Sequence, residues 1–198
     1  MAENQPSLNR RKVVERILSQ RGDALLVTGL GSSSWDAAAA GDQPGNFYLW
    51  GAMGGAAMVG LGIALAQPGR RVLVITGDGE MTMGLGSLAT IAVTAPNNLA
   101  ICVIDNEHYG ETGMQEGHTG AGVDLAAMAA AAGWPETACA RTWDEVEAQV
   151  PVILQAPGPV FVAVKVVVEV LPLVLPPRDG TVLRSRFRAA LLGDKAYE

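Results

Sequence analysis

Two apolar runs, each followed at once by a polar turn, most constrain what this chain can fold into. Residues 71–76 precede the triplet Gly77-Asp78-Gly79, and residues 99–104 precede the pair Asp105-Asn106. A helix-length stretch separates the two, so the chain is expected to return parallel to its starting direction. Asp78 and Asn106 should therefore meet at the carboxyl ends of two parallel strands, the edge at which open α/β sheets bind ligands.

Polar atoms gathered at this edge indicate a cation beside a phosphorylated ligand. A carboxylate and an amide oxygen are hard ligands that suit Mg²⁺. Gly77 and Gly79 let the backbone approach closely, and N–H groups at the helix start after Gly79 can bind a diphosphate. A dinucleotide fingerprint would need a third glycine where Thr82 stands. The remaining alternative, that Asp78 and Asn106 are only a turn and a helix cap, is disfavoured by their spacing.

Strand-like and helix-like segments alternate along the rest of the chain. Strands are expected at residues 24–28, 47–50, 71–76, 99–104, 137–141 and 159–168. Helices are expected at residues 10–20, 54–67, 83–93, 124–132, 142–155 and 182–192, with one more that opens at the turn 29–34 and runs to 40. This order predicts an α/β fold, a doubly wound and mostly parallel sheet with helices on both faces. We expect residues 1–171 to form the domain, and residues 172–198 to form a proline linker and a C-terminal helix.

Composition excludes several classes of function. The chain has 198 residues, of which 49% are hydrophobic and only 5% aromatic, so it can bury one sizeable core of small side chains. A net charge of −6 argues against a nucleic-acid partner. Cys102 and Cys139 are too few for a disulfide framework or a metal cluster and are expected to be small buried residues.

Membrane and export signals are also missing from the pattern. Residues 1–20 are polar and charged, which disfavours a signal peptide. The apolar run 51–66 is shorter than the roughly 20 residues that a membrane span needs. The run 159–175 is interrupted by Lys165, Glu169 and Pro172. We therefore expect no membrane partner and a cytoplasmic location.

The stretch from Gly77 to Asn106 resembles the thiamine-diphosphate motif, which begins GDG and ends NN or DN at about this spacing. The pair Asn97-Asn98 precedes the second strand and does not fit it. Residues 105–115 resemble the DN…TGGQ segment of sulfopyruvate and phosphonopyruvate decarboxylases, although Met114 replaces the second glycine and residues 116–118 replace the usual proline. The likeness is to the diphosphate-binding (beta) subunit or domain of these thiamine-diphosphate-dependent decarboxylases, over roughly residues 9–170.

The resemblance implies thiamine diphosphate and Mg²⁺ as cofactors. The metal ligands it implies are Asp78, Asn106 and the backbone carbonyl of His108. The cofactor-binding residues it implies are Gly51, Ala52, Met53, Gly77, Asp78, Gly79, Glu80, Asn106, His108, Tyr109 and Gly110. The roles of two of these residues remain open at this point. Met53 is either core filler or a support under the bent cofactor, and Glu80 is either an acid of the helix start or a neighbour of the cofactor.

The implied reaction is decarboxylation of a 3-substituted, anionic 2-oxo acid to an aldehyde. The activating glutamate of the family belongs to a pyrimidine-binding domain, which we expect on a separate alpha subunit in an α2β2 or larger assembly. His118 is a weak catalytic candidate within the loop 111–119. Four C-terminal arginines are further candidates for binding the substrate anion: Arg178, Arg184, Arg186 and Arg188. The alternative is that they form a helix face that is solvated or contacts another subunit. Carboligation, 2-oxo-acid oxidation and non-catalytic cofactor binding remain alternatives.

Overall fold

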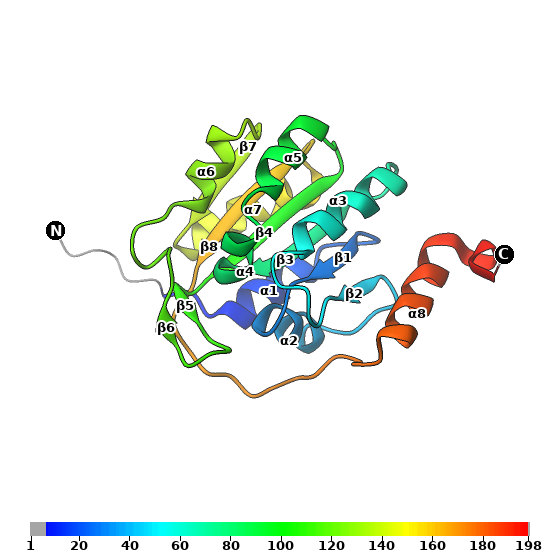
Figure 1. Cartoon of the computed structure of the whole chain (residues 1–198), viewed down its shortest axis with the longest axis horizontal. Coiled ribbons are helices and arrows are strands. Elements are labelled where there is room, and N and C mark those ends of the chain that lie inside the picture. Colours follow the sequence, from blue (N-terminus) through cyan, green and yellow to red (C-terminus); the bar gives the residue numbers. More distant parts are fainter. Residues whose placement is uncertain (1–6, 198) are drawn as a thin grey trace.

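A six-stranded parallel sheet forms the centre of the fold (Figure 1). The structure is a computed structural model that describes residues 7–197. The strands are β1 (Leu25–Thr28), β2 (Asn46–Tyr48), β3 (Val72–Gly77), β4 (Leu99–Asp105), β7 (Glu136–Ala140) and β8 (Val160–Lys165). Their order in the sheet is β2-β1-β3-β4-β8-β7, and every neighbouring pair is parallel. The predicted α/β fold with a parallel sheet is confirmed.

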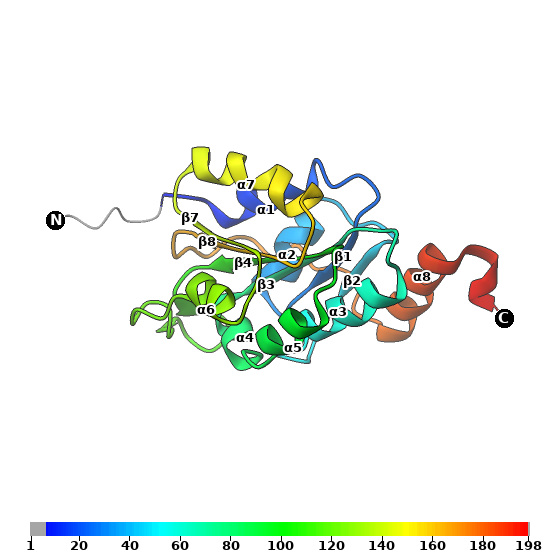
Figure 2. The ribbon, with the colours of Figure 1, turned by 90° about the horizontal axis from the view of Figure 1, so that it is seen from above.

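Helices cover both faces of the sheet (Figure 2). One face carries α1 (Arg10–Leu18), α2 (Ser32–Ala39) and α7 (Trp143–Gln155). The other carries α3 (Ala56–Ala66), α4 (Asp78–Met83), α5 (Ser87–Thr94) and α6 (Leu125–Ala131). The chain ends with α8 (Gly180–Leu192) and the short 3-10 helix η1 (Gly193–Tyr197). None of the helices within residues 7–197 has both the length and the apolarity that a membrane span requires.

The core has two layers because side chains of a strand alternate between the faces of the sheet. In β3, Leu73 and Ile75 pack under one set of helices, while Val72 and Val74 pack under the other. A Cβ atom on Gly60 of α3 would lie 2.3 Å from Val74 Cγ2. The small residues of the chain therefore let its helices lie close on the sheet.

The helix expected at residues 83–93 is present mainly as α5, and the helix start expected after Gly79 belongs to a separate short helix, α4; the break between the two was not predicted. The helix α4 ends at Met83, and α5 begins at Ser87. A Cβ atom on Gly84 would lie 2.4 Å from the carbonyl oxygen of Gly54, so the backbone packs directly on a neighbouring loop and leaves the helical path. A second element was not predicted: the loop after β4 folds into a small antiparallel hairpin of β5 (His108–Tyr109) and β6 (Gln115–Glu116).

The C-terminal part lies along the body of the molecule. Residues 166–179 have no helix or strand and lead from the end of β8 to α8, as the orange segment of Figure 1 shows. The helix α8 packs beside the edge strand β2, where the rings of Phe47 and Phe187 lie 5.4 Å apart. Arg186 pairs with Asp42 at 2.6 Å. A domain boundary at residue 171 stays a prediction.

Candidate functional site

A cavity of about 640 Å³ opens at the carboxyl ends of β3 and β4. Its size is typical of sites for small molecules. The register pairs Gly77 of β3 with Ile104 of β4, so the polar residues that follow the two strands lie side by side, as predicted. The predicted residues that line the cavity are Met53, Gly77, Asp78, Gly79, Glu80, Asn106, His108, Tyr109, Gly110 and His118, together with Glu111 and Thr112 from the loop 111–119.

Other predicted residues lie elsewhere, and some lining residues were missed. Gly51 and Ala52 are not part of the lining, and neither are the four C-terminal arginines. Three of these arginines lie in α8, beside the edge strand β2, and Arg178 lies just before that helix. Residues that line the cavity without having been assigned a role before are Leu30, Ser32, Ser33, Thr82, Met83 and Ile104. The turn at residues 29–34 was recognised only as a helix start, because its contacts with the cavity depend on strand order.

Asp78 is the first residue of α4 and is only 3% exposed. The hydroxyl of Thr119 lies 3.2 Å from Asp78 Oδ2 and 2.8 Å from Asp105 Oδ1, so one hydroxyl serves two neighbouring carboxylates. Burial and the charge of Asp105 raise the pKa of Asp78 to about 6. A bound cation would act in the opposite direction, because it favours the ionised carboxylate. This carboxylate is therefore placed where positive charge stabilises it.

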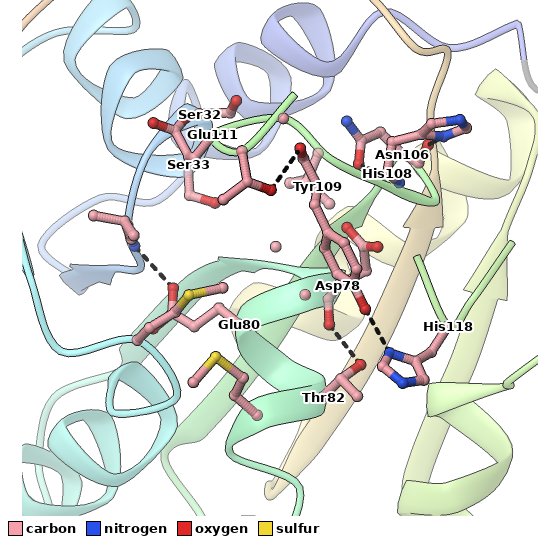
Figure 3. Close-up of a pocket in the computed structure, with 18 residues that line it drawn as sticks. Ser32, Ser33, Asp78, Glu80, Thr82, Asn106, His108, Tyr109, Glu111 and His118 are labelled. Carbon is pink, nitrogen blue, oxygen red and sulfur yellow. Dashed lines mark hydrogen bonds between the residues drawn. The ribbon is translucent and has the colours of Figure 1, made fainter. Parts of the chain in front are cut away.

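Asn106 and His108 face the same cavity from the loop after β4 (Figure 3). The backbone N–H of His108 donates to Asn106 Oδ1 at 3.1 Å, which fixes the turn and leaves that oxygen a second lone pair. Within residues 7–197, no group of three or more His, Cys, Asp or Glu side chains could hold a metal. A metal at this cavity would therefore have to use amide and backbone oxygens as well as Asp78. Carboxylate, amide and carbonyl oxygens are the donors that Mg²⁺ accepts.

Glu80 holds two walls of the cavity together, a role that the sequence did not reveal. Its side chain is buried, Oε2 accepts the N–H of Leu30 at 2.8 Å, and Oε1 accepts the N–H of Ala56 at 3.3 Å. A Cβ atom on Gly29 would lie 1.8 Å from Oε2, so only glycine leaves room for this carboxylate. Burial raises the pKa of Glu80, although its backbone hydrogen bonds act against that shift. The acid links the segments that open α2 and α3.

Met53 and Tyr109 flank the start of α4. Met53 is 43% exposed, so the alternative that it fills the core is wrong. A Cβ atom on Gly79 would lie 2.9 Å from the ring of Tyr109, which therefore covers the first turn of the helix. The Tyr109 hydroxyl is 2.5 Å from His118 Nδ1, which ties β5 to the far end of its loop (Figure 3). His118 thus lines the cavity, and its contact with Tyr109 holds it there.

Comparison with known proteins identifies the family. A family model described as thiamine pyrophosphate enzyme, C-terminal TPP binding domain, matches residues 29–164. The chain belongs to the thiamine pyrophosphate enzyme family. The match contains every residue that lines the cavity, whereas the segment 166–179 and α8 lie outside it.

Two of three relatives of this chain carry the names of decarboxylases, and the third carries that of a synthase. The chain is 41% identical to phosphonopyruvate decarboxylase of Streptomyces viridochromogenes, over 77% of this chain and 38% of that protein. It is also 41% identical to sulfopyruvate decarboxylase subunit beta of Methanothermobacter thermautotrophicus, over 64% of this chain and 68% of that subunit. Acetolactate synthase 2 of Brassica napus is 32% identical and is matched over 28% of its length. The chain thus spans well under half of two of these three relatives.

Solved structures agree on the fold. Benzoylformate decarboxylase from Polynucleobacter necessarius superposes with a TM-score of 0.70 at 20% identity, over 83% of this chain and 33% of that one. At this level of identity the likeness concerns the fold alone. The doubly wound sheet is thus shared with about a third of that decarboxylase chain.

Proposed function

We propose that this chain is the diphosphate-binding subunit of a thiamine-diphosphate- and Mg²⁺-dependent decarboxylase, which converts a 3-substituted pyruvate of the sulfopyruvate type into an aldehyde and CO2. The observation that carries the proposal is the arrangement of Asp78, Asn106 and His108 around one cavity at the carboxyl edge of the sheet. The names of the relatives, phosphonopyruvate decarboxylase and sulfopyruvate decarboxylase subunit beta, support the same class of reaction.

The residues of the chain fit the binding of such a cofactor. Thiamine diphosphate supplies, when bound, the carbon that reacts with the 2-oxo acid, while the protein binds and orients it. Asp78, Asn106 and the carbonyl of His108 would hold Mg²⁺. Backbone N–H groups near Gly79, at the start of α4, would meet the diphosphate. The exposed thioether of Met53 would support the rings from the side, and Glu80 would keep the surrounding loops in place.

A second polypeptide is part of the proposal. The family's pyrimidine-binding half would come from a separate alpha subunit, in an α2β2 or larger assembly. Exposed apolar side chains near the cavity are consistent with a surface that a partner covers. Met53 and Met83, which line the cavity, are 43% and 65% exposed. The word "beta" in the names of several relatives supports such a partner.

The proposal is tested by calorimetric titration of thiamine diphosphate with Mg²⁺ into the chain copurified with its pyrimidine-binding partner. We expect Asn106→Ala to weaken binding at least tenfold, because a charge-assisted oxygen ligand is worth more than about 1.4 kcal/mol. Asn97→Ala is the matched control, since its side chain is exposed and far from the cavity lining. CO2 release from sulfopyruvate, phosphonopyruvate and pyruvate then identifies the substrate. Binding that is equal in both variants would contradict the site.

Carboligation is the second candidate, and the similarity to an acetolactate synthase favours it. The two reactions share the cofactor and differ in the product. A decarboxylase releases one aldehyde for each CO2, whereas a ligase returns a hydroxyketone built from two substrates. Analysis of products by mass spectrometry, with sulfopyruvate alone and with a mixture of 2-oxo acids, separates the two.

A further inference from the structure

A buried ion pair lies beneath the cavity, between the ends of β4 and β8. Lys165 is 5% exposed and Asp105 only 1%. The sheet register places these residues opposite each other, and Lys165 Nζ is 2.8 Å from Asp105 Oδ2. An uncompensated buried charge is strongly unfavourable, so each residue stabilises the other in this place.

The same lysine also reaches the loop that lines the cavity. Lys165 Nζ is 2.6 Å from Glu107 Oε1, and the Glu107 side chain is still 32% exposed. Glu107 has a backbone φ of 63°, in the left-handed region that a side chain disfavours. Its N–H donates to Asp105 Oδ1 at 3.0 Å, and its carbonyl accepts the N–H of Gly117 at 2.6 Å. Lys165 therefore holds Glu107 in a strained conformation, and Glu107 in turn supports the loop through its hydrogen bond with Gly117.

The far end of the loop returns to the same cluster. The hydroxyl of Thr119 contacts Asp105 at 2.8 Å and Asp78 at 3.2 Å, and Thr119 is almost fully buried. Both ends of the segment 106–119 are thus tied to a single carboxylate, which Lys165 neutralises. The groups that this segment brings to the cavity include Asn106, the His108 backbone, Tyr109 and His118.

We propose that Lys165 is a positioning residue for the cavity: through Asp105 and Glu107 it holds the segment 106–119 against Asp78, so that the loop keeps the geometry needed for a cation and a diphosphate. The statement about ligands rests on the proposed function, whereas the statement about the loop does not. A purely structural lysine would need only its partner in the sheet. The second contact, with Glu107, has no counterpart in the sheet and points to control of the loop.

The test compares three variants with one control by backbone hydrogen exchange of the chain without cofactor. We expect Lys165→Met to accelerate exchange within residues 107–119 by about tenfold or more, while the amides of β1 and β3 keep their protection. Glu107→Ala should reproduce the effect, because it removes the contact between Lys165 and the loop. The pair of Lys165 and Asp105 stays intact in this variant. Lys165→Arg should restore protection, since it keeps the charge and the donors. Arg186→Met removes an ion pair at the edge of the sheet and should leave the loop unchanged.

Cofactor affinity provides the second readout. With the partner present, the Lys165→Met and Glu107→Ala proteins should bind thiamine diphosphate and Mg²⁺ at least tenfold more weakly, and Lys165→Arg should bind nearly as tightly as the wild type. Unchanged exchange in the loop, or a loss of protection that is equal across the whole sheet, would overturn the positioning role. If the wild type binds no thiamine diphosphate but the loop responds as described, the proposed function fails and the positioning role stands.

Discussion

At the scale of single residues, the cavity depends on positions where one more atom has no room. Gly29 is such a position, because the Glu80 carboxylate occupies the space of its missing side chain. That carboxylate in turn accepts two backbone N–H groups from separate loops. A change of one methyl group at residue 29 therefore acts on both walls of the cavity at once.

We expect Gly29→Ala to lower the free energy of unfolding by about 1 to 3 kcal/mol, as overpacking in a tight interior does. Gly62→Ala is the matched control: residue 62 is exposed in α3, no atom lies within 4 Å of its added Cβ, and helix propensity predicts a gain of about 0.5 to 1 kcal/mol. Urea denaturation of both variants measures the two effects. If the Gly29→Ala and Gly62→Ala proteins were equally stable, the Glu80 side chain would be moving aside at no cost in the free energy of unfolding.

Asp78 is a residue whose ionisation works against folding in the absence of a cation. Its pKa rises from 3.8 to about 6 on folding, so the folded chain binds the proton more tightly than the unfolded chain. Stability must then fall as the pH rises from about 4 to about 6, and the loss is complete above that range. In EDTA, we expect Asp78→Asn to raise the free energy of unfolding by about 1 to 3 kcal/mol at pH 8 and by little at pH 4. A gain that does not change with pH in denaturation curves would contradict this explanation.

At the scale of elements, the ends of the helices are fixed by side chains from distant segments. Asn98, which precedes β4, donates through Nδ2 to the carbonyl oxygens of Ala64, Gln67 and Arg70 at 3.1, 2.9 and 2.8 Å. These carbonyls belong to the last turn of α3 and the turn after it, which lack partners within the helix. One amide thus joins the end of α3 to the start of a central strand.

We expect Asn98→Ala to lower the free energy of unfolding by about 1 to 3 kcal/mol, because three part-buried carbonyl groups lose the Asn98 amide as a donor. Asn97→Ala, one residue earlier and exposed, should change it by less than about 0.5 kcal/mol. Thermal and urea unfolding of the pair measure the difference. If the two variants were equally stable, water would be replacing the Asn98 amide at the end of α3.

The turn of the β5–β6 hairpin carries an element-scale irregularity at Met114. Its φ is 60°, in the left-handed region, and in the family segment that the sequence resembles this position is a glycine. Relief of this strain is worth about 1 to 2 kcal/mol and is partly offset by the greater freedom of glycine when unfolded. Met114→Gly should therefore raise the melting temperature by a few degrees, or leave it unchanged, in calorimetry. A clear fall would show that the methionine side chain makes contacts that outweigh the strain.

Local patterns predicted the six strands of the main sheet, most helix starts and the position of Asp78 and Asn106 at one edge of the sheet, because each depends on residues that are close in sequence or on a single crossover. The helices expected at residues 124–132 and 142–155 are confirmed for the same reason: Asp124 caps the first, and Thr142 and Glu145 form a capping box at the start of the second. The role of Lys165 could not be predicted. It depends on β8 lying next to β4, and the two strands are separated in the sequence by β5, β6, α6, β7 and α7.

At the scale of the whole molecule, binding and stability are linked. A ligand that binds only the folded chain adds about 2.7 kcal/mol when its free concentration is one hundred times its Kd. For a chain of this length that corresponds to a rise of about 5 to 10 °C in Tm. We expect this rise for the copurified complex with thiamine diphosphate and Mg²⁺, and its loss when EDTA removes the metal. Differential scanning fluorimetry with Asp78→Asn, which should not respond to the ligand, provides the comparison.

The position of β8 in the sheet has a consequence for the order in which the protein is made. Within residues 7–197, β7 pairs with no strand except β8, and β8 lies between β4 and β7 although it is the last strand in the sequence. During synthesis, the strands β2, β1, β3 and β4 can assemble as they leave the ribosome, whereas β7 must wait for a strand not yet translated. Every residue that lines the cavity has been translated once the ribosome passes His118. Lys165, which we propose positions the segment 106–119, is translated later, with β8. A nascent chain therefore contains all residues of the cavity before it contains the lysine that holds their loop in place.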